Sequence, residues 1–262
     1  MITVLGASGF IGSHLVAHLA RSGAAFRAPG RNESLEGTEL GHIIDCVGLT
    51  SDFRSRPWDA VEAHVGRLLE IVRTCAFDSI LYLSSTRLYR LNARPAREAD
   101  PLGFEPEEPE DLYGLSKATG EAMVLSLGAK GRVERLANVY GAGQKDTFLA
   151  SLIAEARTCG VIRLRTARDS EKDYVSVEDV VDLLVKIALG GRHRVYNVAS
   201  GVQVSNTRIV EALAATTGCR IEVAPAAPRI FFPPIDIGRI SEEFGFAPRD
   251  LFAALPGLAA GA

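Results

Sequence analysis

The chain has 262 residues, of which 47% are hydrophobic and 23% are charged, the proportions of an ordinary globular protein with one large domain or a domain with a small appendage. A formal net charge of −3 argues against a general electrostatic attraction to nucleic acid or to anionic lipid. No uninterrupted apolar run approaches the ~18 residues that cross a membrane, so we expect no membrane-spanning segment.

Two features of the sequence predict a cytoplasmic protein. The first strand-like segment, ITVLG, begins at Ile2 and leaves no room for a signal peptide before it. The 4 cysteines are widely separated and include no CxxC pair, which is typical of free thiols in a reducing compartment. The 5 histidines show no metal-ligand spacing, and we expect no metal site.

Short apolar runs alternate with longer helical patterns along the chain. In order, the patterns predict a strand at 2–6, a helix at 9–21, strands at 25–28 and 42–48, a helix at 58–75, a strand at 79–85, a helix after Asp111, a strand at 132–141, a helix at 148–156, a strand at 172–177, a helix at 178–189 and a strand at 194–200. Strands that alternate with helices predict an α/β protein, a doubly wound parallel sheet with helices on both faces, which is the Rossmann fold.

One connection is too short for this pattern. Only residues 29–41 separate the second strand from the third, whereas a crossover with its own helix needs about a dozen residues before its flanking turns. We predict that one βα unit of the usual sheet is trimmed away after the second strand.

The segment from Arg94 to Asp111 is rich in proline and acidic residues, which predicts a solvated loop. Its acidic run, EPEEPED, is interpreted as a solvated lid and not as a cation site.

A glycine-rich motif, GASGFIG, lies between the first strand and the first helix. Gly6, Gly9 and Gly12 permit a tight turn, close approach of a pyrophosphate and close packing of the helix on the strand. The amino end of the helix then offers backbone N–H groups to phosphate oxygens. The motif therefore predicts a dinucleotide-binding turn, with a plain glycine-rich turn as the alternative.

Tyr113 and Lys117 are spaced by one helical turn in the segment DLYGLSKATGEAMV, so their polar ends can reach a common point. A nearby ammonium favours the phenolate, which predicts a lowered pKa for Tyr113 and a general acid/base usable near neutral pH. Ser84 and Ser85 follow the strand SILYL, and the carboxyl ends of such strands face the ligand in open α/β sheets. Either pattern on its own also occurs by chance.

Taken together, these motifs resemble the extended short-chain dehydrogenase/reductase family, also called the NAD-dependent epimerase/dehydratase family. The segments RLANVYGAGQ, KDYVSVEDVVD and ISEEFGFAP resemble further signatures of that family, so the resemblance runs along nearly the whole chain. It implies a dinucleotide-binding Rossmann domain at 1–141 and 173–199. It also implies a small, largely C-terminal substrate-binding region at 142–172 and 200–262.

The resemblance assigns roles to individual residues. Tyr113 would exchange a proton with the substrate, Ser85 would hydrogen-bond the reacting oxygen, and Lys117 would hold the nicotinamide ribose and stabilise the phenolate. The remaining cofactor contacts would come from the two turns at Gly6, Ser8, Gly9, Phe10, Ile11, Gly12, Val47 and Gly48. The substrate contacts would come from Thr86, Asn138 and Lys172.

Departures from the family pattern narrow this interpretation. Dehydratases of the family carry Asp-Glu directly after the catalytic hydroxyl residue, where this chain has Thr86 and Arg87. Lys172 replaces an arginine, which keeps the charge but loses bidentate geometry toward phosphate. We therefore expect an NAD(P)-dependent oxidoreductase or epimerase acting on a nucleotide-linked sugar, by 4-ketoreduction or C4 epimerisation. A ketoreductase of a non-nucleotide metabolite and a catalytically idle sensor or scaffold are the alternatives.

Two expectations concern the cofactor and the assembly. The second strand is followed by Arg27 and Arg31 without the acid that usually binds the ribose hydroxyls of NAD, so we expect NADP, with Arg31 on its 2′-phosphate and NAD as the alternative. The resemblance also implies a homodimer built from the helix around 61–72 and the helix that carries Tyr113, with Ala118, Ala122 and Leu125 as a close-packing stripe.

Overall fold

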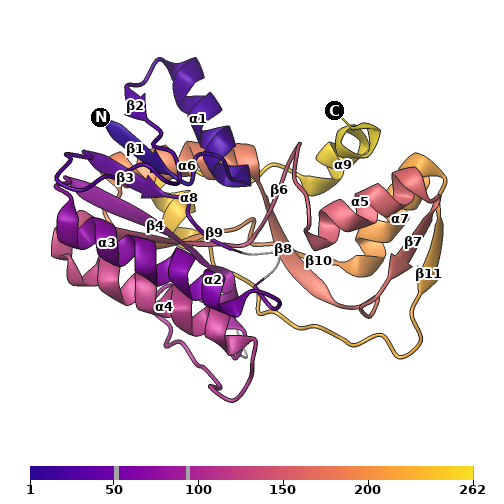
Figure 1. Cartoon of the computed structure of the whole chain (residues 1–262). Coiled ribbons are helices and arrows are strands. Elements are labelled where there is room, and N and C mark those ends of the chain that lie inside the picture. The colour runs from indigo at the N-terminus through magenta and orange to yellow at the C-terminus, as the bar shows by residue number, and fades with distance from the viewer. Residues whose placement is uncertain (50–52, 93–94, 262) are drawn as a thin grey trace.

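The strands of the alternating pattern form one parallel sheet at the centre of a larger lobe (Figure 1). The computed structural model describes residues 1–49, 53–92 and 95–261. The sheet has six strands in the order β2-β1-β3-β4-β5-β9, and every neighbouring pair is parallel. The strands are β1 (Ile2–Leu5), β2 (Phe26–Arg27), β3 (His42–Asp45), β4 (Ser79–Ser85), β5 (Gly131–Leu136) and β9 (Val195–Val198).

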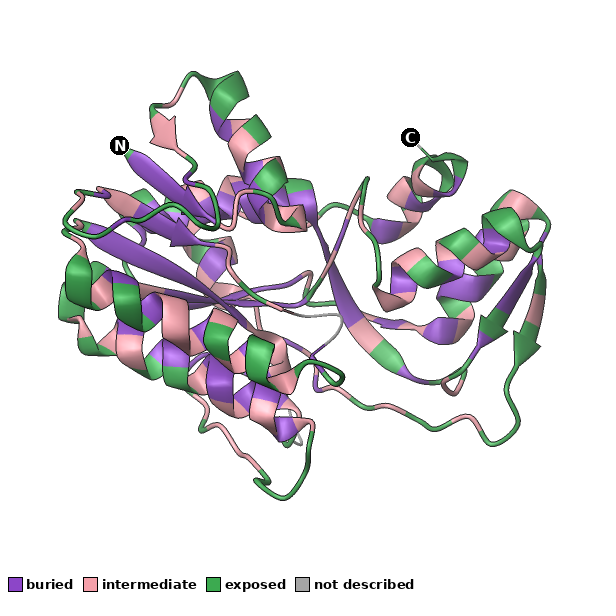
Figure 2. Ribbon diagram, in the orientation of Figure 1, coloured by how far each residue is buried: buried purple, intermediate pink, exposed green. Residues whose placement is uncertain are grey.

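Helices cover both faces of this sheet, as predicted. One face packs against α1 (Phe10–Ser22) and α6 (Val177–Gly190). The other face packs against α3 (Arg67–Thr74) and α4 (Asp111–Ser126). Figure 2 shows buried strands between these layers and exposed residues on the outer surfaces of the helices. The doubly wound α/β fold is confirmed.

The helix predicted at 58–75 is present, but it changes its winding on the way. It begins as α2 (Pro57–Val61), continues as a π-helical turn (Glu62–Gly66) and ends as α3. π-helical turns inside α-helices are frequent at functional sites. Here the turn carries His64, which is completely buried beside α4.

The prediction of a trimmed βα unit is also confirmed. β2 has only two residues and lies at the edge of the sheet. Residues 28–41 run from β2 to β3 without a helix. Leu35 and Leu40 of this connection are buried against β3 and α3, where they fill space on the sheet.

The strand predicted at 132–141 is divided between two sheets. β5 stays in the large sheet up to Leu136, and the backbone N–H of Ala137 still bonds the Val198 carbonyl oxygen at 2.9 Å. The chain then leaves as β6 (Asn138–Tyr140), which pairs in parallel with β8. Asn138 is therefore carried away from the large sheet and into the second lobe.

The second lobe has its own hydrophobic core, built around Leu152, Ile162, Ile209 and Leu213. It contains a three-stranded sheet, β10-β8-β6, and a two-stranded sheet, β11-β7. Its other elements are α5 (Phe148–Thr158), β7 (Val161–Leu164), β8 (Glu171–Ser176), β10 (Gln203–Ser205), α7 (Asn206–Thr217), β11 (Arg220–Val223) and α9 (Leu251–Ala260).

A long connection returns the chain from β11 to the large lobe (Figure 1). It leads to α8 (Gly238–Phe244), whose Ile240 is buried in the core between the large sheet and α6. Residues 235–246 thus pack with the large lobe, although they come late in the sequence. Among the described helices, none has the length and apolar composition needed to cross a membrane.

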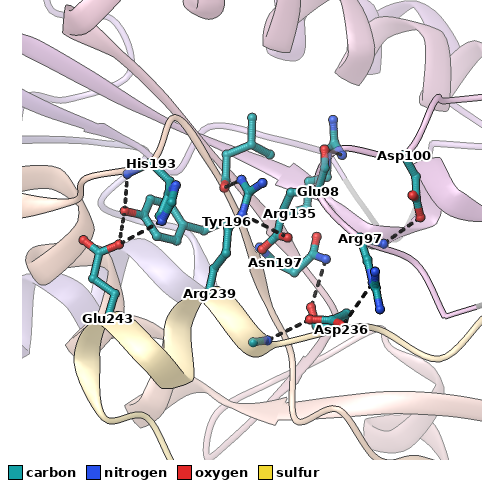
Figure 3. A network of polar contacts seen from close by, with 12 residues as sticks. Arg97, Glu98, Asp100, Arg135, His193, Tyr196, Asn197, Asp236, Arg239 and Glu243 are labelled. Carbon is teal, nitrogen blue, oxygen red and sulfur yellow. Dashed lines mark hydrogen bonds and ion pairs between the residues drawn. The ribbon is translucent and has the colours of Figure 1, made fainter.

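A buried polar network fastens α4 and β9 to the middle of the large sheet. Arg135 of β5 donates to the Glu121 carboxylate of α4 at 2.6 and 2.9 Å, and both side chains are buried. The same guanidinium bonds the Tyr89 hydroxyl at 2.6 Å, which donates to Asn197 Oδ1 at 2.8 Å. Figure 3 shows how this group continues through Asn197 and Glu98 toward α8.

Candidate active site

The glycine-rich turn is shaped by two close backbone approaches. Gly6 has a φ of +71°, and a Cβ atom there would lie 2.8 Å from the backbone carbon of Cys46. A Cβ at Gly12 would lie 2.2 Å from the Gly6 carbonyl oxygen, so a larger residue would push α1 away from β1. Gly9 caps α1 without a side-chain hydrogen bond, which leaves the first-turn N–H groups available to an anion.

The other residues predicted to contact the cofactor surround this turn. Phe10 and Ile11 are partly buried against the core below the turn, and Ser8 is exposed. Val47 and Gly48 directly follow the buried Asp45 at the end of β3, whose carboxylate accepts the Val47 N–H at 3.0 Å. Glycines at 6, 12 and 48 leave the turn and the end of β3 without side chains, which is the arrangement that lets a dinucleotide approach a backbone closely.

Gly48 lies against the predicted catalytic lysine. A Cβ atom at this position would come within 3.4 Å of Lys117 Nζ and 3.7 Å of His64 Nε2. Lys117 is buried and donates to the Leu83 carbonyl oxygen at 2.7 Å. Burial lowers its pKa to about 8, although the carboxylates of Asp45 and Glu121 favour its charged form. The ammonium thus lies where the ends of β3 and β4 meet α4.

Tyr113 and Ser85 meet as the sequence predicts. Ser85 at the end of β4 is a hydrogen-bonding neighbour of the Tyr113 phenol on α4 and favours its ionised form. Ser85 Oγ also accepts the N–H of Arg87, which starts the 3₁₀ turn Thr86–Tyr89. The phenol ring is buried and packs on Phe53, with ring centroids 4.7 Å apart. A hydroxyl pair held in this way can pass a proton to a carbonyl oxygen placed between them.

The expectation that Lys117 lowers the pKa of Tyr113 is wrong. Burial raises the pKa of Tyr113 above its ordinary value, and this outweighs the opposing effects of the Ser85 hydrogen bond and the Arg87 charge. The Lys117 ammonium is engaged by the Leu83 carbonyl oxygen. Tyr113 therefore carries its proton at neutral pH in this state, which suits a proton donor to a ketone.

His64 contacts the main chain of Tyr113 through Ser116 and helps to hold it in place. Ser116 Oγ donates to the Tyr113 carbonyl oxygen at 2.9 Å, so His64 Nδ1, 2.8 Å away, is the donor to Ser116. Nε2 then accepts the Leu49 N–H at 3.4 Å. Burial lowers the pKa of His64 to about 2, which keeps the ring neutral. In the sequence, this role has no signal beyond a histidine within a helical pattern.

The three residues predicted to contact the substrate come from both lobes. Thr86 Oγ1 donates to the Leu136 carbonyl oxygen at 3.2 Å and joins the 3₁₀ turn to β5. Asn138 is exposed on β6 and donates to the Asp173 carbonyl oxygen at 2.9 Å. Lys172 of β8 is largely buried, with Nζ 4.0 Å from the centre of the Phe148 ring. Asn138 and Lys172 belong to the second lobe, whereas Thr86 belongs to the first.

The interpretation of the acidic loop as a solvated lid is wrong in part. Asp111 is buried, and both of its oxygens accept from Arg90, at 2.5 and 2.6 Å. Glu110 pairs with both Arg54 and Arg87. Glu107 and Glu108 are exposed, as predicted. The part of the loop next to α4 therefore binds arginines of the chain itself and fixes the approach to Tyr113.

A cavity of about 300 Å³ lies elsewhere, between α5, α9 and the loop after β6. Gln144, Lys145 and Arg157 are among its lining residues, and Ser85, Tyr113 and Lys117 are not. The described residues bring no three His, Cys, Asp or Glu side chains together as a metal site.

Comparison with known proteins gives one family. The model of the NAD dependent epimerase/dehydratase family matches residues 39–199. A dTDP-4-dehydro-6-deoxy-D-allose reductase of Streptomyces sp is 26% identical, over 97% of this chain and 93% of the relative. A GDP-6-deoxy-D-mannose reductase of Pseudomonas aeruginosa is 28% identical, over 87% and 83% of the two chains.

Solved structures agree with this result. The structure of MoeE5 in complex with UDP-glucuronic acid and NAD superposes with a TM-score of 0.78 at 25% identity. The superposition covers 97% of this chain and 96% of MoeE5. Both lobes are therefore shared, because so complete an overlap leaves no room for a lobe of different fold.

Proposed function

The chain belongs to the NAD dependent epimerase/dehydratase family, and from this premise we propose that it is an NAD(P)-dependent oxidoreductase or epimerase acting on a nucleotide-linked sugar. The reaction is 4-ketoreduction or C4 epimerisation. One observation carries the proposal: the Ser85 hydroxyl neighbours the Tyr113 phenol in a site that also holds the buried Lys117.

Each of these side chains has a role in the proposed reaction. Tyr113 exchanges its phenolic proton with the reacting oxygen of the sugar, and Ser85 donates a hydrogen bond to that oxygen. Lys117 holds the ribose hydroxyls next to the nicotinamide. The nicotinamide, when bound, accepts or supplies the hydride.

The cofactor would lie along the turns already described. Gly6, Gly9 and Gly12 admit the pyrophosphate, and the first N–H groups of α1 bind its oxygens. The remaining proposed contacts are Ser8, Phe10, Ile11, Val47 and Gly48. All of these residues lie at the carboxyl ends of β1 and β3, where open α/β sheets bind their ligands.

The sugar nucleotide would lie between this site and the second lobe. We propose that Asn138 and Lys172 bind it from β6 and β8, and that Thr86 shapes the turn beside Ser85. Residues 142–172 and most of 200–262, together with β6 and the rest of β8, then form the substrate-binding region. The four free cysteines support the cytoplasmic location that we propose for the enzyme.

Native mass spectrometry of the freshly purified protein tests this assignment. We expect a dinucleotide and a nucleotide sugar to remain bound as separate, displaceable masses. A bound dinucleotide together with a non-nucleotide keto compound would favour the alternative of a ketoreductase for a simpler metabolite. If reference dinucleotides added in excess also failed to bind, the proposal would be wrong.

For the cofactor we propose NADP, with Arg31 binding the 2′-phosphate. Arg31 is exposed in the connection after β2, whereas Arg27 is neutralised by Glu33 at 2.5 Å. A charge-assisted contact of this kind contributes about 1.5–3 kcal/mol, which favours NADP over NAD by about 10- to 100-fold.

Titration of both cofactors into wild type, Arg31→Ala and Glu33→Gln tests the preference. Arg31→Ala should weaken NADP alone, and Glu33→Gln serves as the matched change in the same loop. Equal affinities for NAD and NADP in wild type, or an unchanged ratio in Arg31→Ala, would remove Arg31 from the cofactor site. A loss of NAD binding in Glu33→Gln would instead identify Glu33 as a partner of the ribose hydroxyls.

We also propose a homodimer formed by the outer faces of α3 and α4, which lie side by side on one face of the sheet (Figure 1). Leu69 of α3 is 43% exposed, and Ala118, Ala122 and Leu125 are only partly covered or exposed on α4. Analytical ultracentrifugation should give about twice the chain mass of 28.0 kDa, and Ala122→Glu should shift it to the monomer. A wild-type monomer at micromolar concentration would exclude this dimer.

A further inference from the structure

A group of positive charges lies next to Tyr113, and the proposed proton transfer leaves it without a role. The charge of Arg87 favours the ionised form of the Tyr113 phenol, so the guanidinium and the phenol lie within electrostatic range of each other. The Arg87 guanidinium carbon lies 5.3 Å from the centre of the Phe53 ring. The centre of the Tyr113 ring lies 4.7 Å from the same ring centre. Arg87 is therefore close to the atoms that react.

Two further cations belong to the same group. Arg54 lies over the Phe53 ring at 4.6 Å, and Lys172 comes from β8 of the second lobe. The charges of Arg87 and Arg54 both act on Lys172 and, together with burial, lower its pKa to about 8. Each of the three cations thus lies within electrostatic range of another.

The acidic groups around this cluster do not balance it. Glu110 pairs with Arg54 and Arg87 at once, and Asp111, which Arg87 also influences, is bound bidentately by Arg90. Within the described part of the chain, Arg54 and Arg87 therefore share one carboxylate, and Lys172 is in no ion pair. A group with more cations than carboxylates carries a positive potential, which favours the binding of an anion.

Aromatic rings surround the cations on the side of the second lobe. Phe232, in the connection from β11 to α8, lies 5.9 Å from the Arg87 guanidinium carbon. Phe148 at the start of α5 lies 4.0 Å from Lys172 Nζ. Rings of this kind hold a guanidinium in place and limit the access of water, which strengthens its attraction for an anion.

We propose that Arg87, supported by Arg54 and Lys172, selects a substrate that carries a carboxylate on the sugar itself, as in a nucleotide-linked uronic acid. This inference rests on the proposed function, because it specifies the substrate of the same site. Arg87 follows Ser85 by two residues and its N–H bonds Ser85 Oγ at 3.1 Å, so we place the anion that it binds next to the sugar carbon that reacts. The diphosphate is attached on the opposite side of a hexose ring from C4 and lies farther from Tyr113.

Binding of matched sugar nucleotides tests the inference. Isothermal titration calorimetry would compare the glucose and glucuronate conjugates of UDP, and the corresponding pairs for dTDP and GDP, with cofactor-loaded protein. Tyr113→Phe is the background, so that binding is measured without turnover. In the pair that binds most tightly, the carboxylate should improve affinity by about 10- to 100-fold.

Arg87→Leu should reduce this preference to within about two-fold, and Arg87→Lys should keep part of it, because the charge remains without the bidentate geometry. Arg220→Leu, which removes one positive charge from exposed β11, is the matched control and should keep the full preference. Arg87→Gln is a second neutral variant, should Arg87→Leu fail to fold.

Three outcomes would overturn the inference. Equal affinity for the glucose and glucuronate conjugates of every pair, measured with Arg87 intact, excludes a carboxylate site. An unchanged preference in the Arg87→Leu and Arg87→Gln proteins excludes Arg87 as its origin. An equal loss of affinity for both members in those variants assigns Arg87 to the shared diphosphate. If no sugar nucleotide binds at all, the proposed function itself fails, and the carboxylate inference fails with it.

Discussion

Replacing Tyr113 by phenylalanine is expected to reduce turnover by about 10²- to 10⁴-fold, while dinucleotide affinity stays within a few-fold of wild type. The substitution removes only the phenolic oxygen. The ring still packs on Phe53, and Ser116 still bonds the main-chain carbonyl of residue 113. Steady-state kcat and cofactor titration by fluorescence separate the two effects.

Tyr174→Phe is the matched control for this experiment. Like Tyr113, Tyr174 is buried, but it lies in the strand β8. Within the described structure its hydroxyl has no hydrogen-bond partner. Loss of that hydroxyl should leave kcat within about two-fold, because no hydrogen bond is broken. If Tyr113→Phe kept more than about half of wild-type kcat, Tyr113 could not be the proton-exchanging group.

The largest effect on stability is expected from Arg135→Met. Arg135 is 5% exposed, and its partner Glu121 is 3% exposed, so neither charge has access to bulk water. The substitution leaves the Glu121 carboxylate buried without its cation and the Tyr89 hydroxyl without its donor. Breaking a buried pair from one side costs about 3–5 kcal/mol, a large part of a typical folding free energy of about 5–15 kcal/mol.

Denaturant unfolding monitored by circular dichroism measures this loss. The double variant Arg135→Met/Glu121→Met should recover much of the lost stability, because no unpaired charge then remains in the core. Arg67→Met, which breaks the more exposed pair with Glu70 on α3, should change the free energy of unfolding by less than about 1 kcal/mol. A cost for Arg135→Met that is no larger than this control would show that the pair is not effectively buried.

The sequence predicted those parts of the fold that depend on local pattern and on chain length. Alternating apolar runs gave every strand of the large sheet, and the short span from residue 29 to 41 gave the missing βα unit, because no helix with its turns fits there. It did not predict that the chain changes sheets at Ala137. β5 and β6 lie in one strand-like stretch of sequence, and only the tertiary pairing of β6 with β8 divides it.

The candidate site shows the same division. Spacing led to Ser85, Tyr113 and Lys117, since a helical turn and a strand end place such residues near one another. Asp45, His64 and Arg87 were not assigned roles, because their importance comes from burial and from partners far away in the sequence. The effect of Lys117 on Tyr113 also depends on a distant partner. The Lys117 ammonium donates to the Leu83 carbonyl oxygen, and burial is the main influence on the pKa of Tyr113.

Transfer of deuterium tests the central claim most directly. The enzyme would be given a nucleotide-linked 4-keto sugar and a reduced cofactor that carries deuterium at C4 of the nicotinamide. Each cofactor and each stereoisomer of the label would be used in a separate experiment. The product sugar would then be analysed by mass spectrometry. Hydride transfer at the Tyr113 site predicts one deuterium on C4 of the sugar from one of the two stereoisomers with wild type, and labelled product formed about 10²- to 10⁴-fold more slowly with Tyr113→Phe. A wild-type product without deuterium from either stereoisomer, or labelled product at an equal rate from Tyr113→Phe, would contradict it.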